Sequence, residues 1–217
     1  MCRNRNINRL AGSPPRWVVS FLAFATGTML LSCQTVPITG RHQLDLISSH
    51  DEIKLGESAY KDVMKKSTLS RDAASTEMVR RVGQRIAGVA DRPDYQWEFN
   101  LVEEKTPNAF CLPGGKVVVY TGILKYTQDE NGLAVVLGHE ISHALAHHGA
   151  ERMSQGMLAE IAETSASLVL GKGDPQTSDA IQRAFGIGAE YGVLLPFSRE
   201  HESEADHIGL YLMAEAG

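Results

Sequence analysis

Apolar residues recur every three to four positions along several stretches of the chain, which is the spacing of one face of an α-helix. Serine, aspartate or asparagine stands at the start of three of these stretches, where its side chain can cap the first backbone N–H groups. The pattern predicts helices over about Glu52–Lys65, Ala73–Val89, Asp129–Gly149, Arg152–Leu170 and from Ser198 onward, with Gln182–Leu195 as a further candidate; the capping residues are Ser48 or Ser49, Asp129 or Asn131, and Ser198.

Apolar and polar residues instead alternate from Tyr95 to Leu101, which is typical of a half-buried β-strand. Farther along, Pro113-Gly114-Gly115 separates the β-prone runs Asn108–Leu112 and Lys116–Thr121 and predicts a hairpin. Together with the helices, these strands predict an α+β fold that is mainly helical and contains a small antiparallel β-sheet.

The composition is that of one ordinary domain plus a tail. The chain has 217 residues, and 43% of them are hydrophobic, which is enough for a core. The net charge is −5, and no stripe of lysines and arginines runs along the part that is expected to fold. A role in binding nucleic acid or another polyanion is therefore not expected.

The first 32 residues have the pattern of a bacterial lipoprotein signal peptide. Four arginines surround the start of the chain, and the apolar run Val18–Leu31 that follows is too short for a membrane span but has the length of a signal-peptide core. The run ends in Leu30-Leu31-Ser32-Cys33, which resembles a lipobox. We therefore expect residues 1–32 to be removed, Cys33 to carry lipid, and residues 33–50 to form an extended tether. Residue 34 is glutamine rather than the aspartate that often retains lipoproteins in the inner membrane, and this favours the outer membrane. The alternative is an ordinary secretory signal in which Cys33 is incidental.

Cysteine usage agrees with this interpretation. With Cys2 in the leader and Cys33 lipidated, Cys111 is the one cysteine left in the expected mature chain, so no disulfide framework is available. Without lipidation, a bond between Cys33 and Cys111 becomes conceivable. Cys111 as a catalytic nucleophile is a further alternative, and a small buried hydrophobic residue is the favoured interpretation.

Four of the eight histidines lie in the segment Gly138–Gly149, which reads GHEISHALAHHG. His139 and His143 are four residues apart, so on a helix both side chains point the same way, one turn apart, as two ligands of one zinc ion require. Glu140 lies beside the first histidine, where it can take a proton from a water that zinc has activated. A solvated polar face is the alternative, and it is disfavoured because the apolar stripe Leu133–Leu137 places the motif on the buried side.

The last predicted helix, in the segment SREHESEADHIG, offers a third zinc ligand. Glu202 and Asp206 are four residues apart on one face, so we expect Glu202 to bind the metal and Asp206 to accept a hydrogen bond from a ligand histidine. Glu204 is expected to point away as a solvated charge. Three further histidines are expected at the surface, in a supporting position or in the core rather than on the metal; these are His147, His201 and His207.

Taken together, these motifs resemble those of a known family. The segments GHEISHALAHH and SREHESEADHIGLYLMAEAG, with VPITGRHQL, NAFCLPGGKVVVYTGIL and LLPFSRE, are similar to the gluzincin metallopeptidases related to HtpX and the CAAX prenyl protease. The nearest branch in this resemblance is the periplasmic one that includes BepA and LoiP, and the mitochondrial Oma1 peptidase is more distant. The resemblance runs from about Val36 to the last residue and implies a zincin-like zinc metallopeptidase domain over residues 51–217.

Carried over residue by residue, the resemblance implies one Zn²⁺ per chain. His139, His143 and Glu202 match the metal ligands, Glu140 the general base, and Asp206 the aspartate that supports a ligand. His148 matches a family histidine, and no role is assigned to it. The resemblance also implies that the hairpin borders the active cleft, where an extended substrate pairs with an edge strand near Asn108, Ala109 and Phe110. The sequence stops at Gly217, before helices that family members usually have, so a fragment and a short member both stay open.

The expected function is that of a zinc endopeptidase that cleaves misfolded or misassembled envelope proteins. It would act on the periplasmic side of the outer membrane, anchored by lipid on Cys33. The alternative is a zinc-containing chaperone or scaffold that binds unfolded chains there without cutting them. A metal-free lipoprotein is disfavoured, because Glu202 and Asp206 would then match the pattern by coincidence. The sequence does not specify the substrate, the cleavage preference or the oligomeric state.

Overall fold

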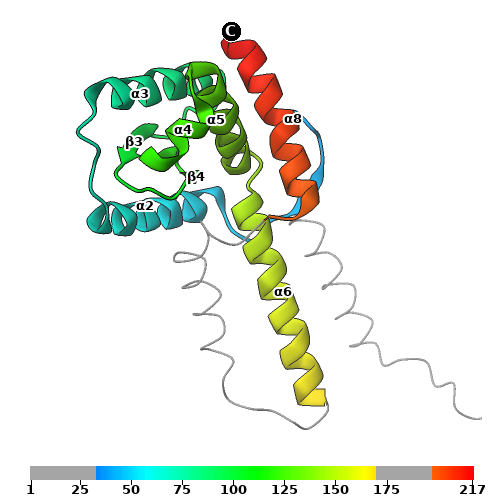
Figure 1. The fold of residues 1–217 in the computed structure, drawn as a ribbon. Helices are drawn as coiled ribbons and strands as arrows, with labels where there is room; N and C mark the ends of the chain where they lie inside the picture. Colours follow the sequence, from blue (N-terminus) through cyan, green and yellow to red (C-terminus); the bar gives the residue numbers. More distant parts are fainter. Residues whose placement is uncertain (1–32, 170–196) are drawn as a thin grey trace, which may run out of the picture. The chain divides into compact units, whose positions relative to one another are not determined.

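The structure of the chain is a computed structural model that describes residues 33–169 and 197–217 (Figure 1). The predicted signal peptide and the predicted helix at Gln182–Leu195 lie outside the described residues. The elements are, in chain order, β1 (Cys33–Thr35), β2 (His42–Leu44), α2 (Ser49–Lys66), α3 (Ala73–Gly88), β3 (Glu98–Val102), β4 (Ala109–Leu112), β5 (Lys116–Tyr120), the 3₁₀ turn η1 (Thr121–Ile123), α4 (Leu124–Thr127), α5 (Glu130–Leu145), α6 (His148–Val169) and α8 (Arg199–Ala216). The predicted α+β, mainly helical fold class is confirmed.

The long helices begin where the sequence places capping residues. Ser48, Asp129 and Ser198 each accept a hydrogen bond from a backbone N–H in the first turn of α2, α5 and α8, at 3.2, 2.9 and 3.2 Å. Asp72 caps α3 in the same way. Such a cap satisfies a donor that the helix leaves unpaired. Among the helices of the described residues, none is both long enough and apolar enough to cross a membrane.

The three-stranded sheet has the order β3-β5-β4. The predicted hairpin is present, since β4 and β5 pair antiparallel with Cys111 opposite Val117. β3 pairs parallel with β5, with Phe99 opposite Val117, so the sheet is mixed rather than purely antiparallel. The reason lies in β5, where Val117, Val118 and Val119 are all fully buried. A strand that is apolar on both faces takes the centre of a sheet, and β3 and β4 then flank it.

The two edges of this sheet differ. The outer edge of β3 is covered by residues 68–70, because the backbone N–H of Ser70 donates to the carbonyl of Leu101, and that of Glu103 to Thr68. No strand of residues 33–169 or 197–217 pairs with the outer edge of β4. β4 also lies against α5, the helix with the histidine motif, and its Cys111 is near Glu140 of that motif.

Helix α5 is the centre of the core, with α8 on one side and α3 and the sheet on the other (Figure 1). It is buried on more than one face, which is why its apolar residues do not form a single clean stripe. The fully buried residues of this core come from α3, the sheet, α5 and α8 and include Val79, Leu101, Val117, Leu133, Leu137, Ile141, Ile208 and Leu212.

Glycines let α5 and α8 approach very closely. A Cβ built on Gly209 of α8 would lie 3.1 Å from both the carbonyl carbon of Gly138 and the backbone nitrogen of His139. These contacts are shorter than the ordinary separation of two carbon atoms, about 3.5–4.0 Å. The glycine pair therefore sets the distance between the two helices next to the histidine motif.

The histidine helix ends earlier than predicted. α5 stops at Leu145, and His147 has a φ of +54°, in the left-handed region that interrupts a helix. α6 then begins at His148, so Gly149 lies inside the first turn of a new helix and does not end the old one. The buried side chain of His147, at the interruption, pairs with Glu52 of α2 at 2.5 Å.

The segment predicted as an extended tether is folded. β1 and β2 pair around a turn, Val36 and Ile47 are buried, and α2 starts at Ser49. This turn, Val36–Arg41, is closed by hydrogen bonds from the Val36 N–H to the Arg41 carbonyl and from the Gly40 N–H to the Val36 carbonyl, at 2.8 and 3.0 Å.

Candidate metal centre

Three side chains from two helices converge on one point. His139 and His143 of α5 bring their Nε2 atoms to 3.1 Å, and the Glu202 carboxylate of α8 lies 3.3 Å from the first and 3.8 Å from the second. Ligands about 2.0–2.1 Å from a tetrahedral zinc ion lie about 3.3 Å from one another. The spacing and the donor set, two imidazoles and a carboxylate, therefore fit zinc with one position left open. The structure thus brings together the three predicted ligands.

The ring of His139 is oriented by Asp206. Its Nδ1 atom lies 2.8 Å from Asp206 Oδ1, one turn after Glu202 on α8. The carboxylate accepts the Nδ1 proton, and this leaves Nε2 unprotonated and directed at the metal position. The structure places Asp206 where the sequence predicted it.

The ring of His143 is oriented by residues to which the sequence analysis gave no role. His143 Nδ1 lies 2.9 Å from Nδ1 of His148, and His148 Nε2 lies 3.0 Å from the Glu204 carboxylate. The Phe197 ring stacks on His143 at 4.1 Å. Burial lowers the pKa of His143 to about 2 and that of His148 to about 4, so both rings are neutral near neutral pH. A neutral imidazole is the form that binds a metal.

Glu140 has the surroundings of a proton acceptor. Burial raises the pKa of its carboxyl to about 8, and the neighbouring charge of Glu202 adds to the shift. A cation held by the three ligands would act in the opposite direction. The surroundings of the Glu140 carboxyl therefore favour its protonated form, and a cation at the neighbouring site would favour its ionised form. This combination suits a general base that later acts as an acid.

Cys111 does not have the surroundings of a nucleophile. Burial raises the pKa of its thiol well above the ordinary value, and the charge of Glu140 raises it further. The thiol donates to the carbonyl of Leu112 at 3.7 Å, and the residue forms part of a cavity wall. The favoured interpretation, a packing residue, agrees with this environment, because the reactive species of cysteine is the thiolate.

The residues predicted to contact substrate differ in their availability. Ala109 and Phe110 are buried, and the Phe110 ring packs with Val102 and Val118 against α2. Asn108 is partly exposed, and its carbonyl accepts a hydrogen bond from the Tyr120 N–H. The Ala109 and Phe110 side chains are therefore occupied by the core, and what β4 can offer a substrate is its open backbone edge.

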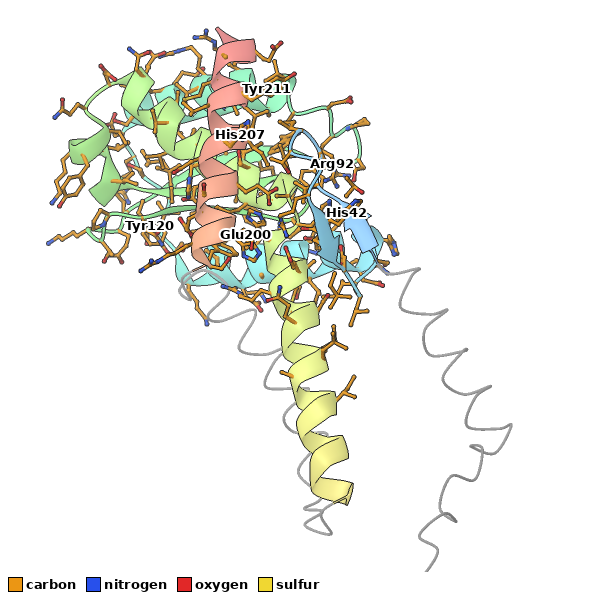
Figure 2. The ribbon with its side chains drawn as sticks, turned by 90° about the vertical axis from the view of Figure 1, so that its right-hand side faces the viewer. His42, Arg92, Tyr120, Glu200, His207 and Tyr211 are labelled. Atoms are coloured by element: carbon orange, nitrogen blue, oxygen red, sulfur yellow. The ribbon has the colours of Figure 1, made fainter. Side chains whose placement is uncertain are left out.

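Two polar residues of α8 are buried: Glu204, which was expected as a solvated charge, and His201, which was expected at the surface or in a supporting position. Glu204 contacts His148 and Arg41, and His201 Nε2 lies 3.0 Å from Glu151. The expectation failed because α8 packs against α5 on one side and meets α6 and the Val36–Arg41 turn on another, so its buried arc is wider than one stripe. His207 is exposed, as expected, on the outer face of α8 together with Tyr211 (Figure 2).

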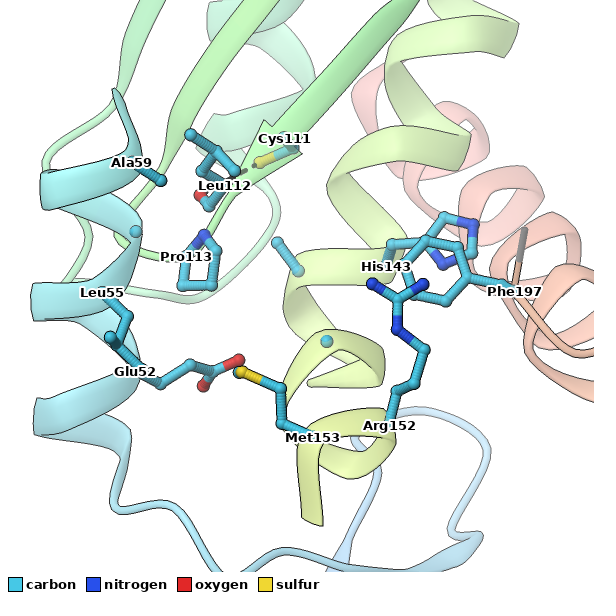
Figure 3. A pocket seen from close by; sticks show the side chains of 13 residues that line it. Glu52, Leu55, Ala59, Cys111, Leu112, Pro113, His143, Arg152, Met153 and Phe197 are labelled. Atoms are coloured by element: carbon cyan, nitrogen blue, oxygen red, sulfur yellow. Dashed lines mark hydrogen bonds between the residues drawn. The ribbon is translucent and has the colours of Figure 1, made fainter. Parts of the chain in front are cut away.

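A largely apolar cavity of about 110 Å³ lies beside His143. Figure 3 shows Glu52 and Leu55 of α2 and the end of the β4–β5 hairpin on one side of it, and His143, Met153 and Phe197 on the other. The cavity thus lies between α2 and the hairpin on one side and one of the candidate ligands, His143, on the other.

Comparison with known proteins identifies the family. Residues 73–217 match the model of peptidase family M48. The chain is 35% identical, over 99% of its length, to mitochondrial metalloendopeptidase OMA1 of Schizosaccharomyces pombe, of which the match covers 64%. It is 41% identical to the OMA1 protein of Arabidopsis thaliana over 56% of this chain and 23% of the relative. It is 28% identical to the beta-barrel assembly-enhancing protease of Escherichia coli over 86% of this chain and 39% of the relative.

These matches bear on the resemblance in three ways. The identities to the mitochondrial proteins are higher than that to the bacterial one, so the likeness does not single out the bacterial branch. The chain spans between about a quarter and two thirds of the length of these relatives. The matched residues 73–217 contain the three converging ligand residues and Glu140. The chain belongs to peptidase family M48.

Proposed function

We propose that the chain is a zinc-dependent endopeptidase. The observation that carries this proposal is the convergence of His139, His143 and Glu202 beside the buried carboxyl of Glu140. The membership of family M48 supports it, as do relatives that are named metalloendopeptidases. When bound, zinc would supply a Lewis acid that polarises the scissile carbonyl and makes water more acidic.

The chain's own residues would then carry the proton. A carboxylate oxygen of Glu140 accepts the proton of the attacking water and later gives it to the nitrogen of the leaving amine. Asp206 holds His139 with Nε2 free, and His148 does the same for His143. Cys111 takes no part, because its thiol stays protonated.

The substrate would bind as an extended chain along the open edge of β4. Backbone hydrogen bonds to an edge strand give affinity with little sequence preference, and only an unfolded segment can offer them. The cavity beside His143 is apolar and has room for one side chain of such a segment. We infer that the substrates are unfolded or misassembled proteins of the cell envelope; the Escherichia coli relative is named a beta-barrel assembly-enhancing protease.

The direct test is digestion of unfolded casein by the full chain in detergent, beside its Glu140→Gln variant. Glu200→Gln is the matched control, because Glu200 is an exposed carboxylate on α8, two residues from a ligand. We expect the parent and Glu200→Gln to cleave equally, and Glu140→Gln to cleave about 10²–10⁴-fold more slowly while binding the same amount of zinc. Equal cleavage by Glu140→Gln would refute the mechanism. A parent that binds zinc and does not cleave would refute the endopeptidase and favour a binding protein.

We also propose that lipid on Cys33 anchors the chain at the periplasmic side of the outer membrane. The leader sequence and the lipobox-like segment support this. Metabolic labelling with a radioactive fatty acid should mark the parent in a bacterial host and leave a Cys33→Ser variant unlabelled. Equal labelling of both, or of neither, would exclude Cys33 as the site of lipidation.

A further inference from the structure

A buried polar cluster lies behind His143, on the side away from the metal position. Its centre is the carboxylate of Glu204, which is 7% exposed. Three donors surround this carboxylate: His148 Nε2 at 3.0 Å, Arg41 Nε at 2.7 Å and the hydroxyl of Thr39. Two of the three come from the Val36–Arg41 turn, which lies more than 160 residues earlier in the sequence.

We propose that the Val36–Arg41 turn is part of the metal centre, because Thr39 and Arg41 hold Glu204, which fixes His148, which in turn positions the metal ligand His143. The four residues are positioning residues: none of them touches the metal or the substrate. The inference rests on the proposed function only in that it needs a metal at the site, and it would hold for a protein that binds zinc without cleaving.

The proton positions follow from the contacts. His143 directs Nε2 at the other ligands, so its proton is on Nδ1 and is donated to His148 Nδ1. The ring of His148 then carries its proton on Nε2 and donates it to Glu204. One tautomer of each ring satisfies every contact, and the negative charge at the end of this series lies between the charged Arg41 and Thr39. The other ligand histidine, His139, donates its Nδ1 proton directly to the carboxylate of Asp206, whereas His143 reaches the carboxylate of Glu204 through His148.

The turn is rigid enough for this role. Val36 is buried in the main core cluster, and the two backbone hydrogen bonds described above close the turn. Arg41 is held from its other side by a bidentate contact with Glu151, at 3.0 and 2.7 Å. Its guanidinium can therefore not move toward or away from Glu204 without breaking contacts to α6.

The competing explanation is that Arg41 and its two carboxylates only stabilise the fold. Glu151 allows the two explanations to be separated. It contacts Arg41 as closely as Glu204 does and is buried to a similar degree, and its other side-chain partners are Gln155 and His201 rather than His148. Glu151→Gln and Glu204→Gln are the same chemical change on two partners of one arginine, and only Glu204 also contacts His148. A glutamine at position 151 can still accept a hydrogen bond from Arg41 and so keep it in place.

The experiment measures zinc affinity by chelator competition and the visible absorption spectrum of the Co²⁺-substituted protein, both on the full chain. We expect Glu204→Gln to weaken zinc binding about 10–100-fold and to alter the Co²⁺ spectrum, since outer groups of this kind contribute that much to metal sites. Glu151→Gln should stay within about threefold of the parent in zinc affinity and keep its spectrum, whatever its melting temperature.

A second variant keeps the test decisive if Glu204→Gln does not fold. Thr39→Val has nearly the shape of threonine and removes one donor to Glu204, and it should change zinc affinity and spectrum in the same direction by a smaller factor. Glu204→Gln or Thr39→Val with the parent's affinity and spectrum, or Glu151→Gln with the same losses as Glu204→Gln, would overturn the inference. A parent that binds zinc and does not cleave casein would refute the proposed function and leave these comparisons valid.

Discussion

The contact between Gly138 and Gly209 makes the assembly of the ligand set depend on a single methyl group. In Gly209→Ala, the new Cβ would lie 3.1 Å from the backbone of Gly138 and His139. Backbone atoms cannot rotate away, so α8 must move. An ordinary contact is reached only when the helices separate by roughly 0.4 Å or more.

The magnitude follows from this displacement. Zinc–ligand distances stay within about 0.2 Å of their usual values, so a shift of roughly 0.4 Å at Glu202 relative to His139 should weaken zinc binding about tenfold or more. Overpacking costs about 1–3 kcal/mol, and the better helix propensity of alanine offsets up to about 1 kcal/mol of this. We therefore expect the melting temperature of the zinc-free protein to fall by about 2–6 °C.

The assay is zinc affinity by chelator competition, together with thermal unfolding followed by circular dichroism. Gly156→Ala is the matched control, because Gly156 is an exposed glycine of α6 with no atom within 4 Å of the position of a Cβ. This variant should bind zinc like the parent and unfold at the same or a slightly higher temperature. If Gly209→Ala behaves like Gly156→Ala in both measurements, the reasoning about the close approach is wrong.

Three further predictions concern the cap of α8, pH and zinc itself. Ser198→Ala removes the cap of α8 and should cost about 1 kcal/mol in urea unfolding, whereas no change would show that the first turn forms without it. Burial raises the pKa of Glu151 and Glu204, but hydrogen bonds to charged and polar partners outweigh it and leave both below the ordinary 4.5. The stability that these two carboxylates contribute is therefore present above pH 4.5 and is lost as the pH falls further. Arg41→Met should lower the unfolding free energy at pH 7 and make its fall at acid pH less steep. A fall as steep as that of the parent would contradict this prediction. Zinc at about 100 times its dissociation constant should add about 2.7 kcal/mol to the unfolding free energy, reversed by chelator, and an unchanged melting temperature would argue against a metal held between helices.

Local rules predicted the local elements of this fold. The caps at Ser48, Asp129 and Ser198 form because a side chain and a backbone donor a few residues apart need nothing else to meet. The hairpin around Pro113-Gly114-Gly115 forms for a similar reason, since both glycines have positive φ values that few other residues adopt. The His-Glu-x-x-His spacing likewise places two ligands on one face without any contribution from the rest of the chain.

Features that depend on contacts distant in sequence were not predictable in this way. The continuous apolar run Val117–Val119 is consistent with β5 as the central strand, but it does not specify that β3 is the strand that pairs with its free side, or that the pairing is parallel. The side chain of His147, at the break between α5 and α6, finds its partner in Glu52, which lies on another helix and 95 residues earlier. Glu204 was placed correctly as pointing away from the metal position. Its partners come from the Val36–Arg41 turn and from α6, so no rule about spacing along α8 could show that it is buried.

The same distinction separates the residues that perform the proposed chemistry from those that hold them. His139, Glu140 and His143 share one helix and keep their relative positions as long as α5 exists. Glu202 joins them only through the packing of α8 on α5, where Ile208 and Leu212 are buried and the glycines meet. Because that packing does not need a metal, the zinc-free protein should keep α8 in place, unlike small zinc domains that unfold without their ion. Zinc would then bind a site that is largely preformed, and changes at the helix contact or at the Val36–Arg41 turn would act on affinity before they act on folding.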